Sequence, residues 1–136
     1  DNLRVCATPN YYVQQLYSTN KGTDVVLATS NGQPLTGKDS LYVSAVINRN
    51  TDELIIKLVN TAPVARESRI LLDGLKTKGK QIGVTRLMAN QLEMGNTLDQ
   101  PMAIVPVKSV ISLEGKINKV ILPPYSFTVM TIPYKK

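Results

Sequence analysis

Most of the chain alternates short apolar runs with turn residues at intervals of about ten positions, a pattern typical of an antiparallel β-sandwich or barrel. Aliphatic and β-branched side chains dominate these runs, and both kinds favour strands. The predicted strands are Asp24–Thr29, Leu41–Asn48, Leu54–Asn60, Ser68–Leu72, Gln81–Ala89, Val107–Leu113, Lys119–Leu122 and Phe127–Ile132.

The clearest local feature is a hairpin built from Leu41–Asn48 and Leu54–Asn60. Successive residues of a strand point to opposite faces, and in Leu41–Ile47 neither face is fully polar. The segment between the strands is rich in Asn, Asp and Thr, which favour turns through local side-chain hydrogen bonds. The sequence therefore predicts that these two strands pair.

A single helix is predicted near the start of the chain, over Asn10–Asn20. Thr8 is suited to cap its free amides, and Pro9 is tolerated at the first helical position. The apolar residues at helical spacing are Tyr12, Val13, Leu16 and Tyr17. Gly22 is expected to end the helix in the left-handed conformation.

The longest irregular stretch is Asn90–Pro106, which contains glycine, asparagine and two prolines. Loops of this length are often binding or docking elements. Pro63 and Pro133 are expected at strand ends or edges because proline cannot donate to a ladder.

Composition points to one domain with an aliphatic core. The chain has 136 residues, 43% hydrophobic content, no Trp and one Phe, enough to bury a single core. Its net charge of +6 permits weak attraction to polyanions. Basic residues are scattered apart from Lys76, Lys78 and Lys80 and the terminal pair Lys135 and Lys136, which we interpret as solvated surface.

The sequence offers no residue set for catalysis or metal binding. It has no histidine and one cysteine, which excludes Ser-His and Cys-His nucleophile pairs, a thiolate zinc site and an internal disulfide. Cys6 is expected to be a buried structural thiol. The acidic residues fall mostly at turns, without a sign of the apolar pocket that raises a carboxyl pKa. We therefore predict no catalytic residue, no metal ligand and no cofactor.

Several partner classes are also disfavoured. Tyr42 is the only aromatic residue between Gly22 and Pro124, whereas single-stranded nucleic-acid binders need several interleaved rings. No apolar segment approaches the ~20 residues needed to span a bilayer. Tyr42, Tyr125 and Tyr134 are candidates for stacking on sugars, but their positions suit packing equally well.

The order of several segments resembles one enzyme family. Thr8–Gly22 looks like the last barrel helix and exit of α-L-arabinofuranosidases of glycoside hydrolase family 51. The segments similar to that family's C-terminal domain are Leu41–Ala45, Leu54–Thr61, Leu72–Leu75, Asn96–Pro101, Val105–Val107 and Leu122–Val129.

This resemblance implies a fragment of a larger retaining hydrolase that releases terminal arabinofuranose from arabinan, arabinoxylan or related glycans. It predicts that residues 1–22 are a remnant of the last helix of an upstream catalytic (β/α)8 barrel. Residues 23–136 would form an all-β, antiparallel, jelly-roll-like β-sandwich after that one helix. None of Glu53, Glu67, Glu93 and Glu114 stands in a segment matching the family's catalytic motifs, so the fragment is expected to be inactive.

The upstream barrel is the predicted partner, and any glycan substrate would be reached only through the parent enzyme. Without the barrel, the helix should fray or lie over the sandwich, with Tyr12, Val13, Leu16 and Tyr17 as the docking face. The family's sandwich tends to borrow a strand from the enzyme's N-terminus, so an open sheet edge and a homo-oligomer are also expected. One alternative function is an autonomous carbohydrate-binding module. Another is a self-contained hydrolase, which would require a catalytic carboxylate pair that the sequence does not visibly supply.

Overall fold

The computed structural model describes residues 3–37 and 39–136, and its main element is an antiparallel sheet of six strands. The strand order is β1-β4-β5-β10-β7-β8. The bounds of these strands are β1 Asp24–Val26, β4 Leu41–Asn48, β5 Glu53–Asn60, β10 Ser126–Pro133, β7 Gln81–Met88 and β8 Val107–Ser112. The central strands β5 and β10 pair along eight residues and form the middle of the large sheet.

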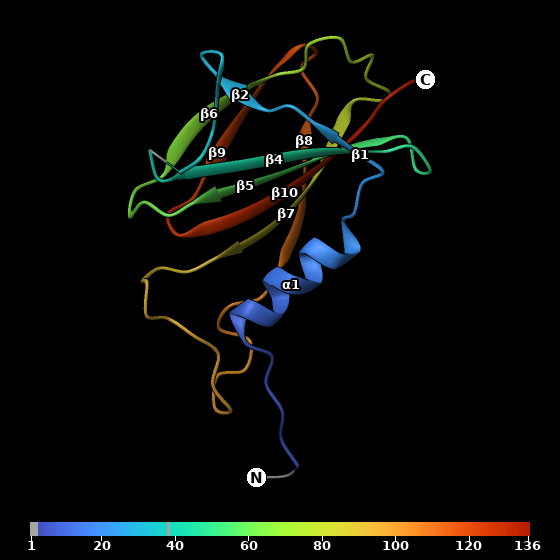
Figure 1. The fold of residues 1–136 in the computed structure, drawn as a ribbon. Helices are drawn as coiled ribbons and strands as arrows, with labels where there is room; N and C mark the ends of the chain where they lie inside the picture. The colour runs from blue at the N-terminus through green and yellow to red at the C-terminus, as the bar shows by residue number, and fades with distance from the viewer. Residues whose placement is uncertain (1–2, 38) are drawn as a thin grey trace.

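A second, smaller sheet covers part of one face of the large sheet (Figure 1). It consists of β6 (Arg66–Leu71) and β9 (Ile117–Leu122), paired antiparallel. Aliphatic side chains from both sheets form the main core, in which Ile82, Leu122, Met130 and Ile132 are fully buried. The predicted all-β sandwich with one N-terminal helix is therefore confirmed.

The helix α1 (Pro9–Thr19) covers the opposite face of the large sheet (Figure 1). It begins as predicted, because Thr8 Oγ1 accepts a hydrogen bond from the Tyr11 amide at 3.2 Å and Pro9 occupies the first helical turn. Leu16 is its buried residue and joins a second core with Ile55, Leu87, Ile104, Phe127 and Val129.

The predicted role of Gly22 in ending the helix is wrong. The helix ends at Thr19 with Asn20 as its C-cap, and Gly22 is not among the glycines with positive φ. A Cβ atom on Gly22 would lie 2.4 Å from Val46 Cβ and 2.9 Å from the Ile47 carbonyl oxygen. Glycine is needed there because the chain passes too close to β4 for a side chain. A left-handed conformation is not the reason, because Gly22 does not adopt one.

The other strands follow the prediction closely, with one exception. The hairpin of β4 and β5 is confirmed, with Asn48 opposite Glu53. The predicted strand Asp24–Thr29 instead stops at Val26, and a small hairpin of β2 (Thr29–Ser30) and β3 (Gln33–Pro34) follows it. Gly32 at its turn has a φ of 75°, which lets the chain reverse within two residues.

The long loop 90–106 has no regular structure but is held in place by Asn96. The Asn96 side-chain amide donates to the carbonyl oxygens of Ala7 and Ile104 at 2.8 and 2.7 Å, and its oxygen accepts from the Ile104 amide at 2.6 Å. These bonds bury Ile104 against the sheet and tie the loop to the segment before α1. The loop is therefore a folded part of the domain.

Candidate functional site

Among residues 3–37 and 39–136, no three His, Cys, Asp or Glu side chains are grouped so that they could hold a metal ion. The same residues form no helix that is long and apolar enough to cross a membrane. Cys6 is a free, partly exposed thiol in the segment before α1, so the prediction that it is buried is wrong. That segment runs along the surface and enters neither core cluster.

The four residues of the predicted docking face come together on the large sheet. Leu16 is buried there, and Tyr12 and Val13 pack against the same cluster. The Tyr17 ring stacks on Phe127 with ring centroids 5.1 Å apart and an angle of 7° between the ring planes. In this chain the face therefore contacts the sandwich, and its assignment to an upstream barrel remains a prediction.

Lys57 is a buried cation beneath the helix, and sequence reasoning missed it. Only 6% of its surface is exposed, and its Nζ donates to the Asn20 carbonyl oxygen at 2.7 Å and lies 5.1 Å from the Tyr17 ring centroid. Burial lowers the pKa of its ammonium group. The cation meets the negative end of the helix dipole, and so it fixes the C-terminal turn of α1 to β5. A lysine in the middle of the apolar run of β5 was the signal for this role.

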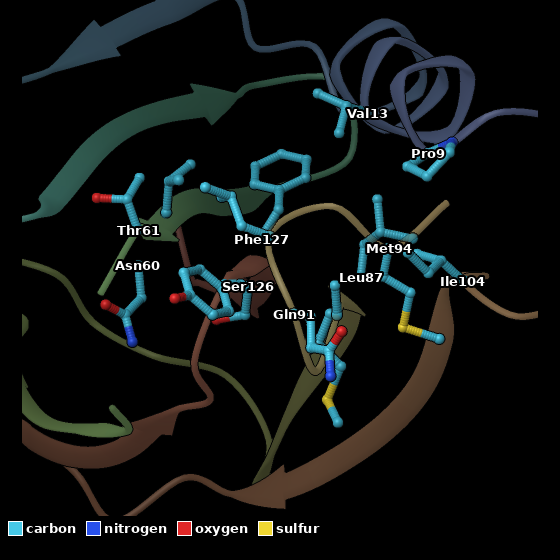
Figure 2. Close-up of a pocket in the computed structure, with 15 residues that line it drawn as sticks. Pro9, Val13, Asn60, Thr61, Leu87, Gln91, Met94, Ile104, Ser126 and Phe127 are labelled. Carbon is cyan, nitrogen blue, oxygen red and sulfur yellow. The ribbon is translucent and has the colours of Figure 1, made fainter. Parts of the chain in front are cut away.

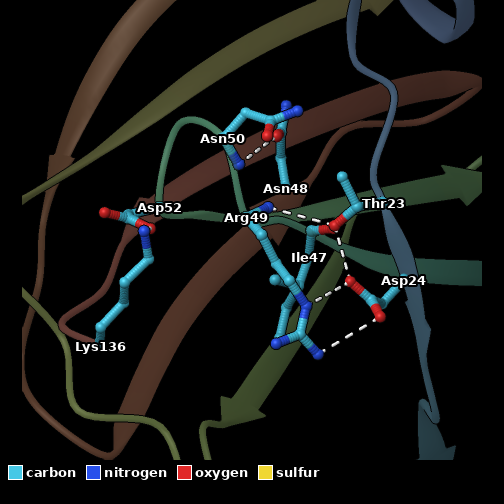
Figure 3. A network of polar contacts seen from close by, with 8 residues as sticks. All are labelled: Thr23, Asp24, Ile47, Asn48, Arg49, Asn50, Asp52 and Lys136. Carbon is cyan, nitrogen blue, oxygen red and sulfur yellow. Dashed lines mark hydrogen bonds and ion pairs between the residues drawn. The ribbon is translucent and has the colours of Figure 1, made fainter.

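A polar network fixes the junction between helix and sandwich (Figure 3). Asp24 accepts two hydrogen bonds from the Arg49 guanidinium, at 2.7 and 3.3 Å, and one from Thr23 Oγ1 at 2.6 Å. These bonds hold the pKa of the Asp24 carboxyl below its usual value, Arg49 being the main cause. The Asn48 side chain donates to the Lys21 carbonyl oxygen at 3.3 Å. The residues after α1 are therefore anchored to the β4–β5 turn.

An apolar pocket of about 290 Å³ opens between the start of α1, the loop 90–106 and the first residues of β10 (Figure 2). Its floor contains Phe127 and Leu87, and no carboxylate lines it. The Ser126 hydroxyl already donates to Pro123, and the Thr61 hydroxyl to Ser40. With its polar groups mostly engaged, the pocket suits an apolar side chain better than a sugar, which needs hydrogen-bond partners.

A larger cleft of about 790 Å³ lies between the two sheets. The small sheet has only two strands, and one edge of β6 has no partner among the described strands. Apolar side chains of β4 and β5 line the cleft, β6 adds both polar and apolar side chains, and Leu27 at the rim is 82% exposed. Leu54, Ile56 and Leu58 on the large sheet are themselves buried, whereas Leu41, Val43 and Ile47 are only partly buried.

The three tyrosines considered for sugar stacking do not form one exposed platform. Tyr125 and Tyr134 are partly buried, whereas Tyr42 is 48% exposed. The backbone of Gly37 lies against the Tyr42 ring, because a Cβ there would be 2.1 Å from the ring. Tyr17, 44% exposed, lies on the same side of the sheet as Tyr42.

Comparison with known proteins identifies relatives along nearly the whole chain. A family model described as the alpha-L-arabinofuranosidase C-terminal domain matches residues 1–126. Alpha-L-arabinofuranosidase 1 of Arabidopsis thaliana is 28% identical over 126 residues, which are 89% of this chain and 18% of that protein.

Solved structures agree in fold. An arabinose-bound α-L-arabinofuranosidase superposes with a TM-score of 0.85 at 23% identity, over 96% of this chain and 20% of the other. The arabinose complex of the enzyme from Thermotoga maritima gives 0.75 at 20% identity, over 93% of this chain and 29% of the other. The chain thus spans less than a third of the length of each of these relatives.

Proposed function

The chain belongs to the family of alpha-L-arabinofuranosidase C-terminal domains, and we propose that it is the non-catalytic sandwich that packs against and stabilises a catalytic barrel. The parent would be a retaining α-L-arabinofuranosidase acting on terminal arabinofuranosyl residues of arabinan- or arabinoxylan-type glycans. Residues 1–22 would be the last helix of that barrel, and the junction at Asp24 and Arg49 would fix the sandwich to it.

The cleft between the two sheets is the observation that carries this proposal. A self-sufficient sandwich closes the space between its sheets, whereas here the partly buried Leu41, Val43 and Ile47 line a cleft beside a free edge of β6. An extended segment of the parent polypeptide would pair with that edge and bury the cleft. Covering the cleft would stabilise the folded domain. Because binding stabilises both partners, the domain would in turn stabilise the rest of the parent polypeptide.

The first test compares activity on an aryl α-L-arabinofuranoside between this chain and a longer polypeptide that contains it. We expect activity only in the longer polypeptide, and a loss of its thermal stability and activity after deletion of Asn31–Lys136. Activity of the short chain alone would reveal a catalytic pair among its ten carboxylates. A longer enzyme that tolerated the deletion would leave the stabilising role without support.

Leu27→Asp tests the cleft more sharply. Leu27 is 82% exposed in this chain, so the substitution should leave the stability of the chain within about 0.5 kcal/mol of the original. In the longer polypeptide a covered Leu27 would lose about 2 kcal/mol of burial. Val64→Asp, at a 60% exposed site outside the cleft, serves as the control, and equal effects of both variants would contradict the proposal. Thermal melts of both variants in both chains, each compared with the unsubstituted chain, measure these changes.

A second copy of the chain is the other occupant that the open edge of β6 admits. Strand pairing between copies would bury the same cleft and produce a homodimer. Static light scattering separates the two cases, because a monomer at high concentration argues against self-pairing.

An autonomous carbohydrate-binding module is the alternative function. The observation in its favour is that Tyr42 and Tyr17 are each nearly half exposed on one side of the large sheet. Titration calorimetry with arabinan and arabinoxylan distinguishes it, since no heat of binding to either glycan would argue against this function.

A further inference from the structure

Two groups of lysines that are separate in the sequence meet at one end of the domain. The Lys135 amide donates to the Lys76 carbonyl oxygen at 2.7 Å, and the Lys78 amide donates to the Pro133 carbonyl oxygen at 2.8 Å. These bonds flank an antiparallel bridge between Thr77 and Tyr134. The C-terminal segment is therefore paired with the loop that carries Lys76, Lys78 and Lys80.

This pairing places like charges together. Residues directly opposite each other in an antiparallel pair share a face, and alternate residues of one strand do so as well. Lys76 lies opposite Lys135, and Lys78 points to the same side as Lys76. Like charges directly opposite each other destabilise a strand pair. The four exposed residues Lys76, Lys78, Lys80 and Lys135 are called the basic patch below.

No ion pair between described residues involves the basic patch. Asp52 pairs with Lys136 at 3.0 Å and Asp73 with Lys116 at 3.8 Å. Glu114 follows Leu113, whose amide donates to the Lys80 carbonyl oxygen, but it makes no ion pair with Lys80. The opposed cations Arg69 and Lys119 on β6 and β9 differ, because Glu67 lies 3.3 Å from Lys119. The chain compensates that pair and leaves the basic patch uncompensated.

We propose that the basic patch binds a polyanionic polysaccharide through its carboxylates, that is, a polymer of uronic acid residues. Lysine ammonium groups are compact charges that suit carboxylates repeated along a flexible chain. A glycan is chosen over other polyanions because the domain is proposed to serve a glycan-degrading enzyme, and this part of the inference rests on that function. The exposed aromatic residues Tyr11, Tyr17 and Tyr42 lie outside the patch, which disfavours single-stranded nucleic acid.

The position of the basic patch keeps it accessible. Figure 1 places the C-terminal end at the opposite end of the molecule from the N-terminus. All four lysines of the basic patch are exposed in this chain, and the proposal requires that a barrel attached through the N-terminal segment leaves them exposed. The domain would then hold an acidic polymer while the rest of the enzyme works on neutral side branches.

The test measures binding of this chain to polygalacturonate at low salt by affinity electrophoresis. Lys76→Gln, Lys78→Gln and Lys135→Gln together should weaken binding about tenfold, as three exposed ion pairs of modest strength would. Arg69→Gln, Lys108→Gln and Lys119→Gln together remove the same charge outside the patch and should leave binding nearly unchanged. Binding of the original chain should also weaken as salt is raised.

Four results would overturn the inference. The first is that the original chain does not bind polygalacturonate, and the second is that both triple variants weaken binding equally. The third is equal or tighter binding to duplex DNA or polyglutamate. The fourth is a lower melting temperature of the patch variant, because relief of like-charge repulsion should not lower it. The binding assay needs no catalysis. A negative binding result therefore does not contradict the proposed arabinofuranosidase function. Negative activity assays, in turn, would not contradict a positive binding result.

Discussion

Replacing Asn60 with alanine is expected to lower the free energy of unfolding by about 3 kcal/mol, because several buried backbone groups lose their partner at once. Only 1% of Asn60 is exposed. The two hydrogens of its side-chain amide are shared among the carbonyl oxygens of Val64, Leu122 and Pro123, which lie 3.0, 3.3 and 2.8 Å from Nδ2, and its oxygen accepts from the Ala62 amide at 3.1 Å.

Asn60 therefore joins the end of β5 to the end of β9 and to the turn before β10. Its loss should affect both sheets, so unfolding should remain a single transition with a melting temperature lower by about 10 °C for a domain of this size. Thermal melts followed by circular dichroism measure the change. Asn90→Ala, in the exposed part of the long loop, is the control and should shift the melting temperature by no more than about 2 °C.

Asn60→Asp separates hydrogen bonding from packing at the same site. Aspartate has nearly the shape of asparagine, but at neutral pH it only accepts hydrogen bonds and would face three carbonyl oxygens. We expect a loss of stability at least as large as for alanine. A variant with aspartate that unfolded at the original temperature would contradict the assignment of the side-chain amide to these three carbonyl groups.

The strands were predictable from the sequence because each one is a short apolar run between turn residues. The hairpin of β4 and β5 formed as predicted, although only the structure shows that Leu41, Val43, Ala45 and Ile47 lie on the side of the main core. The start of the helix was predictable for the same local reason, since Thr8 and Pro9 act on the nearest turn. Residues whose role depends on neighbours close in sequence were therefore identified correctly.

The features that sequence reasoning missed depend on contacts between distant segments. Gly22 is constrained by β4, Lys57 by the end of the helix, and Asn96 by both Ala7 and Ile104. The meeting of Lys76 with Lys135 depends on the path of the C-terminal segment. Periodicity carries no information about such pairs, so these contacts emerged only with the fold.

Replacing Leu16 with aspartate is expected to release α1 from the sheet, with a cost of about 3 kcal/mol or more from lost burial and an unpaired charge in an apolar cluster. Leu16 is 7% exposed and packs with Ile55, Leu87 and Phe127. The helix has 11 residues, and isolated helices of this length are marginal in water, so a released helix should also unravel.

Hydrogen exchange measured by mass spectrometry distinguishes local release from global unfolding. Amides of residues 12–19 should exchange about a hundredfold faster in the Leu16→Asp variant, while those of β5 and β10 keep most of their protection. Gln15→Asp introduces the same residue at an exposed neighbouring position and should change exchange little. If both variants exchanged alike, intrinsic helix propensity rather than burial of Leu16 would hold the helix. If the strands lost protection together with the helix, α1 would be an integral part of the sandwich, which would weaken its assignment to an upstream barrel.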